Sequence, residues 1–493
     1  MGVIIKQSSW ALVANYVGVL LGFLNVMIIM PAVLQPDQIG LVNLILSSAF
    51  IIYPFMDFSA SQLLNRYFTQ VQSPQQMMNV SILVYLTGIL VFFLVFLFGK
   101  PLFIAYYQEN SPEIIPYFWF VFALAVVLGW QVILETYNTI FKHLHINVFV
   151  KEVIFRLLIT LSITLYALKQ IPFETYIHLH FGMYVMVVLI LFFFIIGKGH
   201  FSLQLSLPDF NKEQVKEMGK YGSFVLFTGM ASVLAVRIDT LMLGSLKGLT
   251  EVGVYTIAMF MTALIDIPRR MILQSSFPVI RSSVHLNDWD NIKNIQQKSI
   301  LNLVLICSIM FMMIMINVED IYQIIPKGSL YKDGAWVVLF LGLARLVEVS
   351  NGVNNEIFQA SKHYKYILIF FVLMAFSTIS LNYVFIPDYG YKGAAFATLL
   401  ASVINTIVKV IAFKKVFRIP SYSWKIASIL LVISIIGICC YLLPLPFNSL
   451  FNLPIRSAVA GLLLLAYIHY SRISPELNGI IEQIFSFVLK KLR

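Results

Sequence analysis

The sequence predicts an all-α protein that crosses a membrane many times, and three observations carry that prediction. Hydrophobic residues make up 59% of the 493 residues and charged residues only 12%, whereas charged residues are about a quarter of an ordinary soluble chain. The mean hydropathy is +0.86. Apolar stretches follow one another along the whole chain, each close to the roughly 20 residues that a spanning helix needs. Short Val and Ile runs also suit buried strands, but the lengths and the Leu, Met and Phe content favour helices.

About fourteen spanning stretches are predicted, and they leave little chain for an aqueous domain. The first follows a single Lys and ends in Met30-Pro31 without a small-x-small cleavage site, so we expect a retained helix rather than a signal peptide. In chain order the predicted spans cover residues 10–30, 39–62, 79–99, 115–135, 152–168, 176–196, 221–244, 251–268, 300–317, 335–358, 366–386, 393–413, 424–443 and 452–470.

The net charge of +11 has a topological explanation. With a cytoplasmic N-terminus, roughly two thirds of the Lys and Arg residues fall in cytoplasmic connections and roughly a fifth in the opposite ones, which is the positive-inside pattern. Both termini are therefore expected in the cytoplasm, and anionic headgroups, not nucleic acid, are the expected partners of the basic residues. The three Cys residues fall within predicted helices, and we find no metal motif, P-loop or dinucleotide fingerprint. No metal, cofactor or ATP-driven pumping is expected.

A weak internal repeat predicts two similar halves. Asp37–Leu41 opens the second predicted span and Thr250–Val254 the eighth, each with a Gly at its fourth position, and both spans approach their ends with a proline, Pro54 and Pro268. One interpretation is that any two membrane hairpins look alike. The other is two parallel six-helix lobes flanking a substrate cavity. Their expected bounds, with those of two added C-terminal helices, are 1–205, 206–418 and 419–493.

A set of short motifs in the second half resembles a known transporter family. The motifs are Arg237-Ile238-Asp239-Thr240-Leu241-Met242-Leu243-Gly244, Glu251-Val252-Gly253-Val254-Tyr255, Ile267-Pro268-Arg269-Arg270, Phe277-Pro278, Asn287-Asp288 and Asn351-Gly352-Val353-Asn354, followed by Ser361 and Tyr364. In order and spacing the chain is similar to Wzx-type polysaccharide flippases of the multidrug/oligosaccharidyl-lipid/polysaccharide exporter superfamily.

The resemblance implies a fourteen-helix, two-lobed transporter and not an enzyme. Such a protein moves undecaprenyl-pyrophosphate-linked oligosaccharide units by alternating access, from the cytoplasmic to the periplasmic leaflet of the bacterial inner membrane. The products are surface polysaccharides such as capsule or the O-antigen of lipopolysaccharide. The expected partners are the lipid-linked substrate and the bilayer, with contacts to the polymerase and glycosyltransferases, and the expected state is a monomer.

Two arginines at membrane depth are the leading candidates for substrate contacts. A charge there costs about 2.5–3.5 kcal/mol on insertion scales, so each needs a reason. Arg237 and Arg345 lie near the middle of their predicted spans, and guanidinium binds phosphate oxygens in paired contacts. Further cavity candidates are Asn15 and Asn354. The candidates for salt bridges, or for coupling to a proton or Na⁺ gradient, are Asp239, Glu348 and Asp57.

Local pairing offers simpler explanations for several of these charges. Glu348 follows Arg345 at i+3 and can pair with it, whereas Asp239 follows Arg237 at i+2 and points away from it. Arg156 and Lys409 are expected within about a turn of their helix ends, where they reach water along their own stems. Glu152 is expected to pair with Arg156, and Asp266 with Arg269 or Arg270.

Four alternatives to a flippase each predict a feature of the sequence. A lipid II flippase of the same superfamily is expected to carry arginines in the first helix, where this chain has only Asn15 and Asn25. A multidrug or organic-cation antiporter is expected to have a cavity rich in carboxylates rather than arginines. A lipid-carrier-dependent glycosyltransferase or polymerase is expected to have a large outer loop or an acidic sugar-nucleotide motif. A pure scaffold does not account for the charges within the spans.

Overall fold

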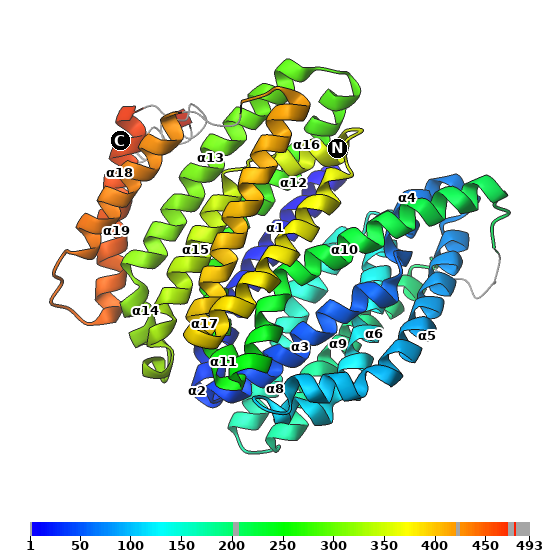
Figure 1. The fold of residues 1–493 in the computed structure, drawn as a ribbon, viewed down its shortest axis with the longest axis horizontal. Helices are drawn as coiled ribbons and strands as arrows, with labels where there is room; N and C mark the ends of the chain where they lie inside the picture. The colour runs from blue at the N-terminus through cyan, green and yellow to red at the C-terminus, as the bar shows by residue number, and fades with distance from the viewer. Residues whose placement is uncertain (1, 201–206, 421–423, 472–477, 480–493) are drawn as a thin grey trace. The chain divides into compact units, whose positions relative to one another are not determined.

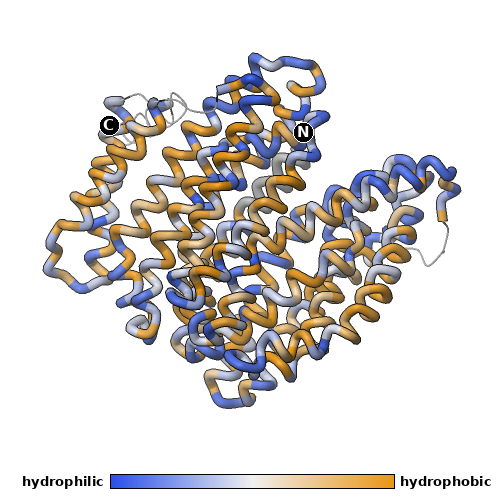
Figure 2. Tube along the Cα trace, viewed as in Figure 1, coloured by the Kyte–Doolittle hydropathy of each residue, from blue (hydrophilic) through white to orange (hydrophobic). Residues whose placement is uncertain are grey.

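The computed structural model describes residues 2–200, 207–420, 424–471 and 478–479. Every regular element in these ranges is a helix (Figure 1), so the predicted all-α membrane fold is confirmed. Figure 2 shows apolar residues along the helices and hydrophilic residues gathered mainly near the turns. Apolar side chains along the helices suit contact with lipid, and a helix pairs its own backbone groups, as hydrocarbon requires.

The described residues contain 10 helices long and apolar enough to span a membrane, or 12 if each of two bent pairs is one span. Two further features account for the difference from fourteen. Helix α17, Tyr366–Phe417, has 52 residues and non-helical angles at Gly390 (φ 55°, ψ −135°), which divide it into two arms. A straight helix of that length would measure about 78 Å, far more than one bilayer core. The helix from Leu144 to Ala167 also has the length of a span but carries several charges.

The chain forms two compact units, residues 1–256 (unit 1) and 257–493 (unit 2). The lobe bounds expected from the repeat stay a prediction. The helices that begin in unit 1 are α1 (Gly2–Phe23), η1 (Leu24–Ile29), α2 (Met30–Val33), α3 (Pro36–Asp57), α4 (Ala60–Tyr67), η2 (Phe68–Gln70), α5 (Pro74–Tyr107), η3 (Pro112–Tyr117), α6 (Phe118–Ile140), α7 (Leu144–Phe149), η4 (Val150–Ile154), α8 (Phe155–Ala167), α9 (Phe173–Gly197), α10 (Lys212–Lys247) and α11 (Leu249–Ala263).

Unit 2 contains the remaining helices, together with the last residues of α11. They are α12 (Asp266–His285), α13 (Trp289–Ile316), α14 (Val318–Ile324), η5 (Gly328–Leu330), η6 (Lys332–Gly334), α15 (Ala335–Val349), α16 (Asn354–Ala360), α17, α18 (Trp424–Tyr441) and α19 (Ser449–Ser471).

Helix α3 is the central helix of unit 1, where it packs against α5, α6 and α10. Two thirds of its apolar stretch are buried, the largest share among the spans. Its start is well defined by the sequence. Pro36 occupies the first turn, where its missing N–H is not needed, and the side chains of Gln35 and Gln38 form a reciprocal capping box.

The two repeat motifs of the sequence cross each other within unit 1. A Cβ added to Gly40 would lie 1.9 Å from the carbonyl oxygen of Leu249, and one added to Gly253 would lie 1.9 Å from that of Pro36. Asn43 donates a 2.7 Å hydrogen bond to Thr256, and these two residues are 213 positions apart. The contact is reciprocal, as in an interface with two-fold symmetry. Close approach of the backbones explains why both positions are Gly.

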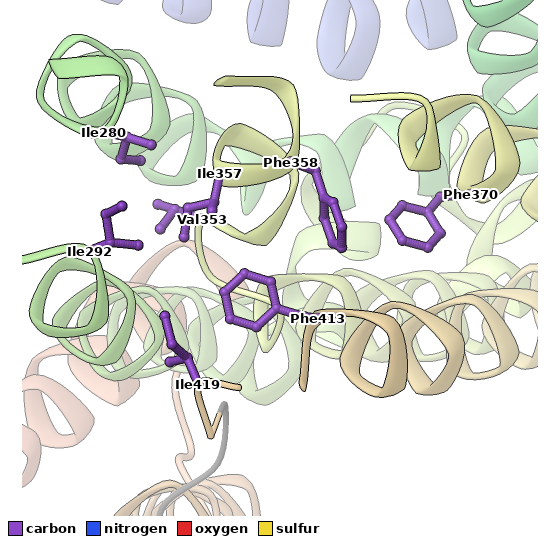
Figure 3. Close-up of a cluster of buried hydrophobic side chains, with 8 residues drawn as sticks. All are labelled: Ile280, Ile292, Val353, Ile357, Phe358, Phe370, Phe413 and Ile419. Carbon is purple, nitrogen blue, oxygen red and sulfur yellow. The ribbon is translucent and has the colours of Figure 1, made fainter. Parts of the chain in front are cut away.

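In unit 2, α15 packs along α17, and α13 packs against α12, α15 and α18. A cluster of buried hydrophobic side chains fixes one end of this arrangement (Figure 3). Its members come from α12, α13, α16, α17 and the segments that flank them. They are Ile280, Ile292, Val353, Ile357, Phe358, Phe370, Phe413 and Ile419. The cluster holds α16 in place after the bend of 47° that separates it from the preceding helix.

Candidate functional site

Four charged side chains form a ring within unit 2. Asp266 and Arg269 come from the start of α12, and Arg345 and Glu348 from α15. Arg269 pairs with Asp266 at 3.5 Å and with Glu348 at 3.2 Å. Arg345 pairs with Asp266 at 3.3 Å and with Glu348 at 3.7 Å. Each arginine therefore contacts both carboxylates, and the ring has no net charge.

This ring shows what local pairing predicts and what it misses. The expected i+3 contacts, Arg345 with Glu348 and Asp266 with Arg269, are both present. The shorter contact of each arginine is made to the other helix, between residues 79 positions apart in the case of Arg269 and Glu348. No spacing rule predicts such a contact. The ring gives Arg345 a structural role in addition to the substrate contact that remains predicted for it.

Lys409 differs from the expectation. It was expected to extend to water near a helix end, but it is buried, with 8% of its surface exposed. Its ammonium group lies 5.8 Å from the centre of the Phe370 ring and interacts electrostatically with Glu348 and Glu356. Ser402, on the same arm of α17, donates a 3.4 Å hydrogen bond to Glu348. The packing of α17 against α15 thus places Lys409 beside the charged ring.

Arg237 of α10 has very different surroundings in unit 1. Its guanidinium lies 4.7 Å from the centre of the Phe50 ring on α3, a cation–π contact worth about 0.5–2 kcal/mol. It interacts electrostatically with the hydroxyl groups of Tyr53 and Tyr184. Among the residues that the structure describes, it forms no ion pair with a carboxylate. The side chain is partly exposed, so its charge remains available to an anion.

The other candidate carboxylates of unit 1 have specific partners. Asp239 is buried and accepts a 2.8 Å hydrogen bond from the Tyr255 hydroxyl, a partner other than Arg237, as its i+2 position indicated. Asp57 ends α3 and accepts from the backbone N–H and the hydroxyl of Ser61, at 3.2 and 2.9 Å. It thereby caps α4, which begins after two residues with left-handed angles, Phe58 and Ser59. Ion coupling by either group stays a prediction.

The two asparagine candidates lie in opposite environments. Asn15 on α1 is exposed. Asn354 is fully buried and accepts a hydrogen bond from Gln296 of α13. Gln296 also accepts from the backbone N–H of Val353, so these contacts hold the break between α15 and α16. The position of Asn354 suits this structural task, and its contact with the substrate cavity stays a prediction.

Sequence reasoning placed Arg156 too close to a helix end. The predicted span began at residue 152, whereas the helix in the structure runs without a break from Leu144 through η4 and α8 to Ala167. Arg156 therefore lies at its middle, paired with Glu152 at 2.8 Å as predicted. Asn25 of η1, which the sequence marks only as a polar residue of the first predicted span, donates a hydrogen bond to the carbonyl oxygen of Arg156. The charges of Lys151 and Glu152 hid the true start of this span.

Unit 2 also contains a large apolar groove. Its volume is about 1070 Å³, and it runs between α13, α15, the second arm of α17, and α18. Hydrophobic side chains such as Phe311, Met312, Leu339 and Ile433 line most of it, and its charged lining residues are Glu319, Lys332 and Asp333. The sequence does not reveal such a groove, because a groove-lining Leu or Ile has the same spacing on a helix as one that faces lipid.

A family model described as "Polysaccharide biosynthesis protein" matches residues 4–284 of the chain. A curated relative from Haloferax volcanii, a probable low-salt glycan biosynthesis flippase, is 21% identical over 212 residues. That match covers 43% of this chain and 44% of the relative's length.

Solved structures show the same fold at low identity. The lipid II flippase MurJ in an inward closed conformation gives a TM-score of 0.71 at 15% identity, covering 95% of this chain and all of that one. An inward-facing multidrug resistance transporter of the MATE family gives 0.64 at 12% identity, covering 83% of this chain and 98% of that one. These two likenesses establish the fold alone.

Proposed function

Because this chain belongs to the polysaccharide biosynthesis protein family, we propose that it carries a lipid-linked oligosaccharide across the membrane. It is a multi-pass membrane protein of a flippase superfamily. The proposed substrate is an undecaprenyl-pyrophosphate-linked repeat unit, moved from the cytoplasmic to the periplasmic leaflet for surface polysaccharide synthesis. The proposal places the protein in a bacterial inner membrane with both termini in the cytoplasm, as the charge pattern predicts.

The environment of Arg237 is the single observation that supports this proposal most strongly. Arg237 presents a partly exposed guanidinium within a spanning helix, next to an aromatic ring and without a carboxylate partner among the described residues. Such a charge is costly at membrane depth, and an anionic ligand relieves that cost. A diphosphate provides oxygens that guanidinium binds in paired, charge-assisted contacts. We therefore assign Arg237 to the diphosphate of the substrate.

The apolar groove of unit 2 supports a lipid-linked substrate. A polyprenyl chain is flexible and apolar, and a groove of about 1070 Å³ lined mostly by hydrophobic side chains offers it contact along its length. Glu319, Lys332 and Asp333 are the charged residues among those that line it. A substrate with a long apolar tail matches this lining.

A lipid II flippase is the second candidate within the same superfamily. The structural likeness to MurJ supports the fold but not the substrate, at 15% identity. The first helix of this chain has no arginine, and Asn25 on its π-helical turn is already bonded to the neighbouring helix. We therefore favour an oligosaccharide repeat unit over lipid II.

The test is complementation in a bacterial strain that lacks its oligosaccharide flippase. The wild-type chain should restore surface polysaccharide, Arg237→Ala should reduce it at least tenfold, and Arg237→Lys should restore only part, since Lys keeps the charge but loses the paired geometry. Arg281→Ala, at an exposed position, is the matched control and should behave as wild type. Membrane protein levels are measured for every variant. Full polysaccharide with Arg237→Ala at normal protein level contradicts the assignment.

Rescue of a strain depleted of its lipid II flippase separates the second candidate from the first. The proposal expects no growth rescue there by the wild-type chain. Growth rescue in that strain without any restored polysaccharide would reverse the order of the two candidates.

A further inference from the structure

A second arginine in unit 1 occupies an unusual position. Arg156 lies at the middle of the continuous helix from Leu144 to Ala167, so it cannot be explained as a side chain that extends to water at a helix end. About a quarter of its side chain is exposed, as is about a quarter of its partner Glu152. A buried ion pair with no further task is weak evidence for stability, because the desolvation of both charges offsets their attraction.

The fold makes room for this pair on the surface of α1. Glu152 accepts two hydrogen bonds from the Arg156 guanidinium, at 2.8 and 3.1 Å. A Cβ on Gly22 would lie 1.6 Å from a guanidinium nitrogen of Arg156, and one on Gly18 would lie 2.6 Å from the Cβ of Glu152. Two glycines one turn apart on α1 thus form a bare strip of backbone on which the pair rests. Any larger side chain at Gly22 would displace the guanidinium.

The backbone around Arg156 is also held in place. Asn25 donates a 2.9 Å hydrogen bond to the carbonyl oxygen of Arg156 and accepts one of 2.7 Å from Thr160. Asn25 belongs to the π-helical turn η1, and the residues just before Arg156 form the π-helical turn η4. π-Helical turns are rare and are frequently found at functional sites, and here they lie in the two helices that meet at Arg156.

A shared tyrosine connects Arg156 and Arg237 within unit 1. Tyr184 of α9 packs against Phe155 with ring centres 4.5 Å apart, and its hydroxyl interacts electrostatically with both arginines. A second chain of contacts leads the same way. Lys151 pairs with Glu135 of α6 at 3.5 Å, and Glu135 and Arg237 both interact electrostatically with the Tyr53 hydroxyl.

We propose that Arg156 is a second substrate contact, which together with Arg237 distinguishes a diphosphate from a monophosphate. This inference rests on the proposed function and extends it. In the substrate-free protein Glu152 forms a salt bridge with Arg156. When the substrate binds, one of its two phosphate groups displaces the Glu152 carboxylate from the guanidinium. Two guanidinium groups then face two phosphate groups. Gly18, Gly22 and Asn25 are positioning residues that hold Arg156 at the site.

The experiment measures binding of farnesyl diphosphate and farnesyl monophosphate to the purified full-length protein. Arg156→Ala should weaken diphosphate binding about tenfold, the loss of one charge-assisted contact, and change monophosphate binding less than twofold. Arg237→Ala should weaken binding of both. Glu152→Gln should tighten diphosphate binding several-fold, because it removes the competing carboxylate. Gly22→Ala should reproduce the effect of Arg156→Ala with all charges retained.

If Arg156→Ala folds poorly, the variant Arg156→Lys takes its place in the binding experiment. The melting temperature of each variant shows whether it is folded. Lysine should retain monophosphate binding and lose most of the preference for diphosphate. If the ion pair is purely structural, Arg156→Ala and Glu152→Gln should lower the melting temperature and leave the preference for diphosphate over monophosphate unchanged. That result would overturn the inference about Arg156 but not the proposed function. If the wild-type protein binds neither phosphate, the proposed function fails together with it.

Discussion

Units 1 and 2 both place arginines in spanning helices, but they treat the charge in different ways. In unit 2, Arg345 shares two carboxylates with Arg269 in a ring without net charge. In unit 1, Arg237 faces an aromatic ring and has no carboxylate partner among the described residues. Depth along the helix does not separate these two residues. The difference is made by acidic side chains that distant segments bring to one arginine and not to the other.

The largest effect should come from breaking the ring. Arg345→Ala leaves two carboxylates with one arginine, and loss of one partner of a buried pair costs about 3–5 kcal/mol. The lower end applies here, because about a quarter of the Arg345 side chain is exposed. Arg237→Ala strands no carboxylate and removes only the cation–π contact with Phe50, so it should cost less than about 2 kcal/mol. Thermal unfolding of the purified variants checks both values. Equal destabilisation by the two would remove the contrast between the units.

A double-mutant cycle sharpens the same comparison. Asp266→Asn combined with Arg345→Gln should be more stable than the sum of the single changes predicts, by about 1–3 kcal/mol, because each removes the charge that the other leaves unbalanced. The matched pair in unit 1, Arg237→Gln with Asp239→Asn, should be additive within about 0.5 kcal/mol. If the effects of Asp266→Asn and Arg345→Gln on stability are additive, the two side chains are not energetically coupled.

Substitutions at Gly40 and Gly253, where α3 crosses α11, should have an intermediate effect on stability. They test whether the contact between the two helices is symmetric. Gly40→Ala and Gly253→Ala each insert a Cβ 1.9 Å from a carbonyl oxygen of the opposite helix, so each should cost about 1–3 kcal/mol. Gly182→Ala on α9 is the control, since a Cβ there meets nothing within 4 Å, and it should be neutral or slightly stabilising. Clearly unequal costs at Gly40 and Gly253 would argue against a reciprocal contact.

A smaller effect separates the two asparagine candidates. Asn354→Ala removes an acceptor from the buried Gln296 and should cost about 1 kcal/mol of stability. Export per folded molecule should stay normal. Asn15→Ala, at an exposed site on α1, should leave the melting temperature unchanged. Loss of export by Asn354→Ala at wild-type protein level would instead support Asn354 as a substrate contact.

The smallest effect is a pH dependence at one end of unit 1. Burial, with the nearby positive charges of His200, His145 and Lys198, lowers the pKa of His143, which lies between α6 and α7. The unfolded chain therefore binds this proton more readily than the folded one. Stability should be complete above the unfolded pKa of about 6.5 and should fall as the pH drops below it. His143→Gln should reduce the change in melting temperature between pH 8 and pH 5. The control His178→Gln should leave that change as it is in the wild type.

The helices and their local charge pairs were accessible from the sequence, but the contacts between distant segments were not. Spans follow from apolar runs, and the pair of Glu152 with Arg156 follows from its i+4 spacing. The depth of Arg156 was missed, since the charges of its own helix disguised where that helix begins. The contact between Arg345 and Asp266 depends on how α12 meets α15, which no local pattern encodes. The family resemblance was confirmed: its motifs lie in the second half of the chain, and the family model matches residues 4–284.

The reciprocal contact between Gly40 and Gly253 has a consequence for the origin of the protein. If the two motifs descend from one ancestral segment, then Asn43 and Thr256, which now share a hydrogen bond, were once the same residue in two copies of a shorter chain. The crossing of α3 and α11 would then be the remnant of a homodimer interface. Gene fusion would have made that encounter intramolecular, and the two partners were free from then on to diverge into Asn and Thr.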